Sequence, residues 1–134
     1  LRRHDVPLLI YQGRLNLIDR KPIETGILPF CKEKGIGFIA FSPLAQGLLT
    51  DRYLEGIPAD SRMARGHFLT KDRLTPELME YVLALKSDAS KNKQTTSEAA
   101  LRWVLAQEGV TSVLIGASSV NQLEQNLKCI DTNK

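Results

Sequence analysis

Small and hydroxyl-bearing residues follow an apolar run near the C-terminus and lead directly into a predicted helix. The segment reads Ile115-Gly-Ala-Ser-Ser119, and Ser119 with Gln122 has the spacing of a capping box. A helix N-terminus exposes unpaired N–H groups and a partial positive charge, so it can hold a phosphate. Gly116 would permit close backbone approach, and Ser118 would donate a hydroxyl hydrogen bond. An ordinary strand-to-helix turn with good capping fits the same pattern.

Three side-chain amides lie on the first turns of that helix, three to four residues apart, at Gln122, Gln125 and Asn126. Side-chain amides at this spacing can hydrogen-bond the edge of a nucleobase. A solvated polar helix face is the alternative interpretation, and both stay open at this point.

A second candidate segment follows another apolar run and reads Ser42-Pro-Leu-Ala-Gln-Gly-Leu-Leu49. Its position at the carboxyl end of a predicted strand is where ligands bind in α/β proteins. It opens a long loop, about residues 42–74, of the kind that often works as a lid or binding loop. Arg52, Arg62 and Arg65 in this loop could clamp an anion in bidentate fashion, or could be scattered surface arginines.

The elements that would position these groups alternate between strands and helices. Apolar runs predict strands buried on both faces at Val6–Gln12, Ile36–Phe41 and Val110–Ile115. Helices are predicted at 24–34, 76–91, 95–106 and from 119 onward. This order favours a parallel α/β sheet with its helices as crossovers. Three strands would leave two open edges and an uncovered face, so the pattern indicates part of a larger barrel or doubly wound sheet.

The composition of the 134 residues fits a single domain spanning 1–134, with 43% hydrophobic and 25% charged residues. Basic and acidic residues are interspersed at a net charge of +3, so we expect no nucleic-acid partner. No apolar run approaches the ~18 residues of a membrane span. Cys31 and Cys129 have no metal spacing and indicate reduced thiols in a cytoplasmic protein. The N-terminus has neither an initiator Met nor a signal peptide, which suggests that the chain begins inside a longer one.

Three motifs in order resemble the aldo-keto reductases: Gly35–Leu49, Gly56–Arg62 and Ser112–Asn126. Within that family the chain is most similar to the bacterial L-glyceraldehyde 3-phosphate reductase branch, which is related to voltage-gated potassium channel β subunits. The resemblance extends from about Val6 to Ile130. It implies a partial (β/α)8 TIM barrel in which these strands correspond to the sixth, seventh and eighth, and it removes the doubly wound alternative.

The resemblance also implies NADPH as cofactor and assigns its contacts. Gln12 would hydrogen-bond the nicotinamide carboxamide, with Phe41 close by. The loop around the pyrophosphate and ribose would comprise Ser42, Pro43, Leu44, Ala45 and Gly47, with Arg52 and Arg62 facing phosphates. The cradle for the 2′-phosphate and adenine would comprise Gly116, Ser118, Gln122, Gln125 and Asn126.

The chain departs from the family at the residues that perform catalysis. The family's Tyr proton donor and its Lys, Asp and His partners come from earlier strands, and Tyr11, Tyr53 and Tyr81 match none of those motifs. No catalytic residue is therefore assigned in this chain. Relatives usually read Gln-Pro-Ser-Tyr-Asn where this chain reads Gln12-Gly-Arg-Leu-Asn16. We expect Leu15 to replace a ring over the nicotinamide and Gly13 to loosen the turn.

Three functional interpretations follow. The chain is the NADPH-binding C-terminal portion of a reductase that converts aldehydes or ketones to alcohols and is inactive alone. Alternatively, it is a non-catalytic nucleotide-binding or regulatory module. The third interpretation is a partial barrel that completes itself by self-association, in place of a missing N-terminal half.

Overall fold

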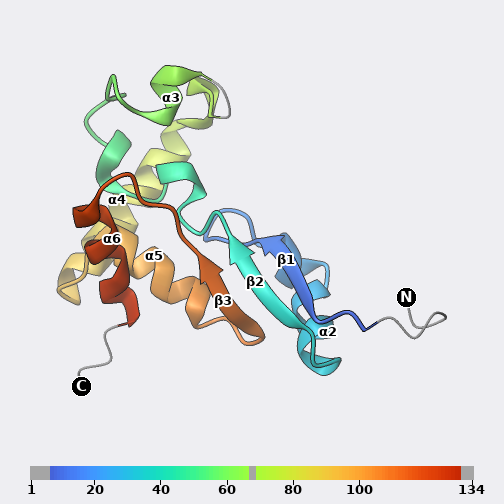
Figure 1. Ribbon diagram of the computed structural model, residues 1–134. Helices are drawn as coiled ribbons and strands as arrows, with labels where there is room; N and C mark the ends of the chain where they lie inside the picture. The colour runs from blue at the N-terminus through green and yellow to red at the C-terminus, as the bar shows by residue number, and fades with distance from the viewer. Residues whose placement is uncertain (1–6, 67–68, 131–134) are drawn as a thin grey trace.

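Three parallel strands form the sheet at the centre of the computed structural model, which describes residues 7–66 and 69–130 (Figure 1). They are β1 (Ile10–Arg14), β2 (Gly37–Phe41) and β3 (Val110–Leu114), in the order β1-β2-β3. The parallel pairing is as predicted, but β1 runs from Ile10 to Arg14 instead of ending at Gln12, and residues 7–9 before it form no strand. Val6, the predicted first residue, lies outside the described residues. The ladder starts where Gly37 N–H donates to the Leu9 carbonyl (2.9 Å), because β2 offers no partner before that point.

The helices begin where their capping residues predict. The helix α4 (Pro76–Lys91) is capped by Thr75, and α5 (Thr96–Leu105) by a complete capping box of Thr95 and Glu98. The bounds predicted for a helix at 24–34 are wrong. This part of the chain forms two helices, α1 (Lys21–Glu24) and α2 (Ile27–Glu33), because Gly26 between them adopts a left-handed φ of 77°.

The loop at 42–74 is a series of short turns rather than an irregular lid. It contains the 3₁₀ turns η2 (Ala45–Gly47), η3 (Asp51–Tyr53) and η4 (Lys71–Arg73) and the short helix α3 (Arg62–Arg65). Buried side chains hold it against α4 and α5 in one hydrophobic cluster that includes Leu49, Tyr53, Met63, Val82 and Ala100. The loop therefore shares a hydrophobic core with α4 and α5.

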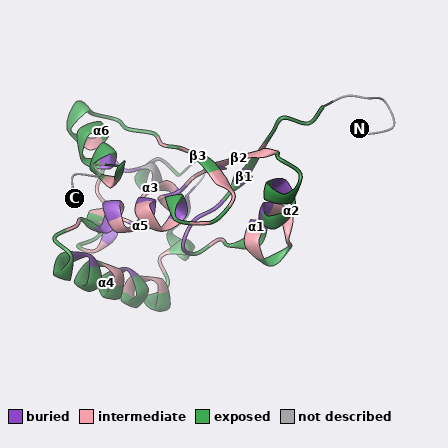
Figure 2. Ribbon diagram, turned by 90° about the horizontal axis from the view of Figure 1, so that it is seen from below, coloured by how far each residue is buried: buried purple, intermediate pink, exposed green. Residues whose placement is uncertain are grey.

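A second hydrophobic cluster joins the sheet to the helices that cover one of its faces (Figure 2). Phe38 and Ala40 of β2 pack with Leu28 and Cys31 of α2 and Val104 of α5. Trp103 is partly buried and packs against both clusters. Burial raises the pKa of the Cys31 thiol, and neither Cys31 nor Cys129 is in a disulfide within the described residues.

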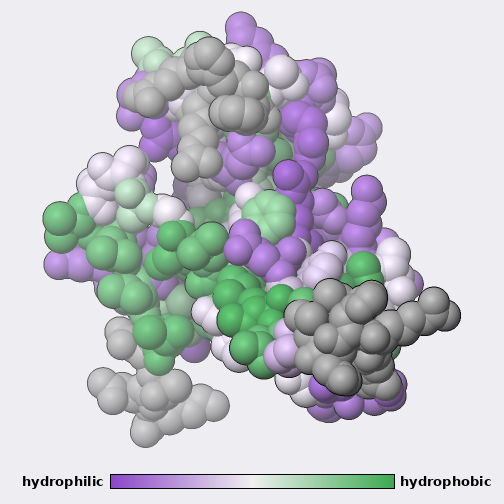
Figure 3. All heavy atoms as spheres, turned by 45° about the vertical axis from the view of Figure 1, so that its right-hand side comes forward, coloured by the Kyte–Doolittle hydropathy of each residue, from purple (hydrophilic) through white to green (hydrophobic). Residues whose placement is uncertain are grey.

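The opposite face of the sheet and its two edges carry exposed apolar side chains, so the strands are buried on one face only. Leu9 is 70% exposed beside β1, and Leu114 is exposed on β3. The last helix, α6 (Val120–Leu127), with the 3₁₀ turn η5 (Lys128–Ile130) after it, exposes an apolar stripe from Val120 (73% exposed) to Ile130 (56%). Figure 3 shows apolar surface gathered on this side of the molecule. No helix of the described residues is long and apolar enough to cross a bilayer.

Candidate functional site

The carboxyl ends of the three strands bring the predicted site residues to one edge of the sheet. Phe41 of β2 is paired with Arg14 of β1 on one side and with Leu114 of β3 on the other. The loop that begins at Ser42 and the turn that begins at Ile115 therefore leave the sheet side by side (Figure 1). The structure thus gathers two segments that lie more than 70 residues apart in the sequence.

Gln12 and Phe41 lie on the sheet face opposite the helices, because side chains alternate along a strand. Gln12 is exposed and paired with Ile39, one position before the Ala40 that faces the helices. The prediction for Leu15 is wrong: it is buried in the cluster beneath the sheet and cannot cover a ligand on the Gln12 face. Leu15 lies three residues after Gln12, and since side chains alternate along an extended chain, it points to the opposite face from Gln12.

Gly13 also has a different role from the one expected. It lies within β1, and a Cβ there would come 2.7 Å from Cζ of Phe38 and 2.9 Å from Cε1 of Tyr11. Gly13 therefore allows the two aromatic rings to pack under the sheet and does not loosen a turn. The rings of Tyr11 and Phe38 lie 5.6 Å apart between centroids.

Arg14 is a residue of this face that the sequence interpretation left out. Its side chain is exposed, and its guanidinium carbon lies 5.6 Å from the centroid of the Phe41 ring, a cation–π arrangement. The parity of Arg14 with Gln12 along the strand was the signal that could have identified it. A positive charge therefore lies beside the aromatic residue expected near the nicotinamide.

The loop after β2 is held in a tight left-handed path. Ser42, Ala45 and Gln46 have φ values of 53°, 48° and 61°, and Gly47 has 99°. Each non-glycine residue in this region costs of order 1–3 kcal/mol, which the surrounding contacts must offset. Ala45 N–H donates to the Ser42 carbonyl (3.0 Å) and Gly47 N–H to the Leu44 carbonyl (2.9 Å). Pro43 and Ala45 are buried, whereas Ser42, Leu44 and Gly47 are half-buried.

The side chain of Asn16 connects this loop to the end of β1. Asn16 is 1% exposed, and its Nδ2 donates to the Ser42 carbonyl at 2.9 Å. Its Oδ1 accepts from the backbone N–H groups of Ile18 (3.0 Å) and Asp19 (2.8 Å). Asn16 closes the motif compared with the family above, but the sequence interpretation assigned it no role.

Arg52 is already engaged by a carboxylate. Its Nη2 lies 2.9 Å from Oδ2 of Asp60, so a phosphate would have to compete with that ion pair. Ser61 is buried and its Oγ accepts from Ala64 N–H (3.1 Å) at the start of α3. The side chains of Arg62 and Arg65 lie outside the described part of the structure.

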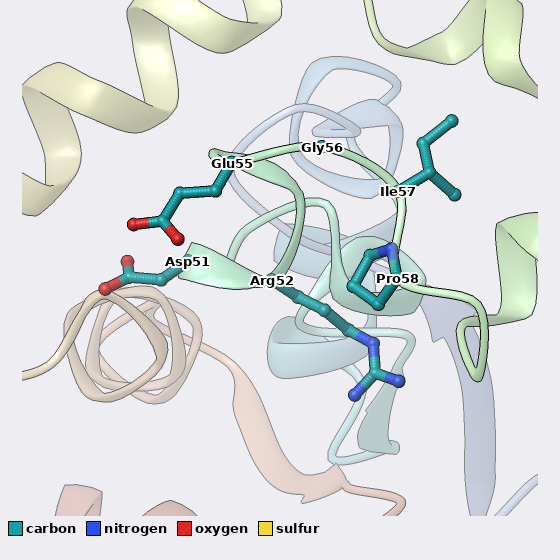
Figure 4. A pocket seen from close by; sticks show the side chains of 6 residues that line it. All are labelled: Asp51, Arg52, Glu55, Gly56, Ile57 and Pro58. Atoms are coloured by element: carbon teal, nitrogen blue, oxygen red, sulfur yellow. The ribbon is translucent and has the colours of Figure 1, made fainter.

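A hollow of about 270 Å³ adjoins Arg52, lined by Asp51, Arg52, Glu55, Gly56, Ile57 and Pro58. Figure 4 shows the carboxylates of Asp51 and Glu55 on one side and the guanidinium of Arg52 pointing the other way. Asp51 also binds Lys86 Nζ (3.1 Å) and the Thr96 hydroxyl, which tie the loop to α4 and α5. None of the strand ends lines this hollow, so we assign the candidate site to the strand ends and not to it.

At the turn after β3, the donors expected to hold a phosphate already meet an internal acceptor. Gln122 Oε1 accepts from Ser118 N–H (2.9 Å) and from Ser118 Oγ (2.8 Å). Ser119 caps α6 by accepting from Gln122 N–H (3.2 Å). The predicted capping box is thus shifted, because the Gln122 side chain returns to Ser118 instead of Ser119. Gly116 is exposed beside these donors.

The two remaining amides differ in their surroundings. Asn126 is 6% exposed on α6, which packs against α5. Gln125 is exposed, and its Nε2 lies 3.4 Å from Oδ1 of Asn121. Gln122 and Asn126, four residues apart, share one side of the helix, whereas Gln125 faces solvent.

None of the tyrosines has the setting of a proton donor. Tyr11 packs on Phe38, the hydroxyl of Tyr53 is buried without a hydrogen-bond partner, and Tyr81 is exposed on α4. His4 and His67 lie outside the described residues. Within those residues no cluster of His, Cys, Asp and Glu could hold a metal ion.

Parallel strands, helical crossovers and donor-rich loops at the strand ends define an α/β protein of the kind that binds ligands at that edge. The sequence model of the aldo/keto reductase family matches residues 1–134, so the chain belongs to that family. L-glyceraldehyde 3-phosphate reductase of Escherichia coli is 44% identical over 135 residues, which cover 98% of this chain and 39% of that protein. A probable voltage-gated potassium channel β subunit of Arabidopsis thaliana is 34% identical, over 92% of this chain and 38% of that protein.

A solved structure supports the fold. A thermostable aldo-keto reductase crystallised with the inhibitor epalrestat superposes with a TM-score of 0.64 at 24% identity, over 93% of this chain and 35% of that one. The chain therefore spans well under half the length of these relatives.

Proposed function

We propose that this chain is the C-terminal, NADPH-binding portion of an aldo-keto reductase that reduces aldehydes or ketones to alcohols. The observation that carries the proposal is the meeting of the Ser42–Gly47 loop and the Gly116–Ser119 turn at the ends of paired strands. Membership of the family supplies the reaction class. Two cysteines without a disulfide in the described structure fit a cytoplasmic protein.

The residues at the turn after β3 fit a phosphate. Ser118 directs its N–H and its hydroxyl at one acceptor, the side-chain amide oxygen Oε1 of Gln122, so the same pair of donors can serve a phosphate oxygen when the Gln122 side chain rotates away. The N-terminus of α6 adds a favourable partial charge. These donors favour NADPH over NADH, since a 2′-phosphate would use them.

The other residues position the rest of the cofactor. Gln12 and Phe41 share the open sheet face, where an amide and a ring can hold a nicotinamide. The left-handed loop from Ser42 to Gly47 would hold the pyrophosphate and ribose, with Arg52 and Arg62 nearby in sequence. Bound NADPH would supply the hydride for reduction of a small carbonyl compound.

We further propose that β1, β2 and β3 are the sixth to eighth strands of a (β/α)8 barrel. The open edges and the exposed apolar face would be covered by an N-terminal half of the barrel. Without that half, a second copy of the chain would cover them.

A non-catalytic nucleotide-binding module is the second candidate function. The similarity to a probable potassium channel β subunit and the packing positions of the tyrosines favour it. A catalytic Tyr with its Lys, Asp and His in a longer form of the protein would decide for the reductase.

Titration of the chain with 2′-phospho-AMP and with AMP tests the nucleotide assignment. We expect 2′-phospho-AMP to bind about tenfold more tightly, as one or two charge-assisted hydrogen bonds would give. Ser118→Ala should reduce this preference and leave AMP affinity unchanged. Equal affinities, or no binding of either nucleotide, would count against the assignment.

The chain alone is expected not to reduce aldehydes. No proton donor is assigned among its residues, and loss of general acid catalysis lowers the rate ~10²–10⁴-fold. NADPH oxidation is followed by absorbance with glyceraldehyde 3-phosphate or methylglyoxal. A rate within about tenfold of a full-length relative would contradict this prediction, because it exceeds what that loss allows.

A further inference from the structure

We infer that Asn16 is a positioning residue for the nucleotide-binding loop, which it holds in its left-handed path through the carbonyl of Ser42. The inference rests on the proposed function for its effect on cofactor affinity, and on geometry alone for its effect on the loop. Asn16 is 1% exposed, so its side chain acts through the loop and is not assigned a direct contact with the nucleotide.

Three hydrogen bonds use the two ends of the Asn16 amide differently. The oxygen closes the turn after β1 by accepting from Ile18 and Asp19 N–H. The nitrogen crosses 26 residues of sequence and donates to Ser42. One end therefore serves a local turn and the other a distant loop, so a substitution can remove the second function and keep the first.

Ser42 is the residue at which the chain leaves β2 and enters the loop. Its φ of 53° turns the chain away from β2, and its carbonyl also accepts from Ala45 N–H (3.0 Å), which closes the turn that leads into η2. Asn16 and Ala45 therefore hold the same oxygen. When the Asn16 donor is lost, the left-handed residues lose an external support and the loop can relax to unstrained backbone angles.

Because Asn16 is buried, its side-chain amide is difficult to replace by another polar group. A buried donor and acceptor that face each other are costly to mismatch. Asn16→Asp keeps an oxygen for the Ile18 and Asp19 N–H groups but turns a carboxylate oxygen toward the Ser42 carbonyl. Asn16→Ser is neutral, can still accept in the turn, and is too short to replace the bond to Ser42.

Hydrogen exchange of the loop amides tests the inference without any nucleotide. In both variants the N–H groups of Ala45, Gly47 and Leu48 should exchange about tenfold faster than in the unsubstituted chain, the effect of one lost hydrogen bond. The amides of α4 and α5 should be unchanged. Asn92→Asp is the matched control, since exposed Asn92 also donates its Nδ2 to a backbone carbonyl, that of Asp88 (3.0 Å).

Nucleotide affinity separates loop positioning from general destabilisation. NADPH would contact both the loop and the turn after β3, whereas 2′-phospho-AMP would contact only the turn. We expect Asn16→Ser to weaken NADPH binding about tenfold and to leave 2′-phospho-AMP binding unchanged. Equal weakening of both ligands would indicate a structural role only and overturn the inference.

The remaining outcomes are also decisive. Unchanged hydrogen exchange of the loop amides in both variants would overturn the inference. Faster exchange in Asn16→Asp alone would also overturn it, since that result would reflect the introduced charge.

If the unsubstituted chain binds neither nucleotide, the proposed function fails while the exchange result still decides the role of Asn16. If neither variant folds, NMR of the unsubstituted chain should show one Asn16 side-chain amide proton protected from exchange, and rapid exchange of both protons would overturn the inference.

Discussion

At the scale of single residues, the structure separates the polar groups that the sequence placed together on α6. Gln122 is occupied by Ser118, Asn126 is buried, and Gln125 faces solvent beside Asn121. A helical spacing of three or four residues indicates one side of a helix, but it does not say which side packs against a neighbour. Asn126 therefore has the strongest claim to a specific role among these amides.

Asn126→Ala should weaken binding of 2′-phospho-AMP by about three- to tenfold, the loss of one or two neutral hydrogen bonds to adenine. The helix should remain folded, because the Ser119 cap and its packing against α5 hold it. Leu123 and Leu127 do not anchor it, since both are exposed. Isothermal titration measures the affinity and circular dichroism the helix content.

Asn121→Ala is the matched control for this prediction, because Asn121 lies on the same helix and is not assigned to the nucleotide site. Its exposed amide interacts only weakly with Gln125 (3.4 Å), so we expect affinity and stability to be unchanged. Equal losses in the two variants would contradict the assignment of Asn126 to the adenine subsite.

At the scale of elements, local signals predict helix starts well and strand limits less well. Thr75 with Pro76 and Thr95 with Glu98 mark the starts of α4 and α5, because capping is a contact within four residues. The start of strand β1 depends on the residue at which β2 begins to pair with it, and no local sequence signal shows where that pairing begins. The break at Gly26 was missed because apolar spacing continues across it.

Thr95→Ala should destabilise the chain by about 1 kcal/mol, within a range of 0.5–2 kcal/mol for such caps. The substitution removes the bond from Glu98 N–H to the Thr95 hydroxyl (3.1 Å) at the start of a helix that is largely buried. Denaturant unfolding measures the change in free energy.

Thr75→Ala provides the comparison, since it removes one bond (3.2 Å) at an exposed helix start. We expect a smaller loss than for Thr95→Ala. A larger loss at Thr75 would contradict the view that the α5 cap supports the core more directly.

At the scale of the whole molecule, the open sheet face and the stripe on α6 govern how the chain behaves alone. Exposed side chains include Leu9, Ile10, Leu114, Leu123 and Ile130. Each large apolar side chain left in water forgoes ~1.5–3 kcal/mol of stabilisation. Together these losses compare with the total stability of a domain, ~5–15 kcal/mol.

We therefore expect the purified chain to self-associate. Light scattering should give a mass above 15.0 kDa that rises with concentration. Leu123→Lys on α6 and Leu9→Lys beside β1 should each reduce association. The substitution with the larger effect identifies the apolar surface through which copies of the chain associate. A concentration-independent monomer with a cooperative thermal transition would refute this prediction.

The parallel α/β order, the main helix starts and the family could be predicted from the sequence, because these depend on local spacing and on motifs contiguous in the chain. The two segments that follow β2 and β3 could be identified in the same way. Which side chains share a face became evident from the three-dimensional packing, in which Leu15 is buried, Arg14 lies over the Phe41 ring and Asn16 donates to the Ser42 carbonyl. Those contacts depend on strand register and on packing between residues distant in sequence, which local patterns do not encode.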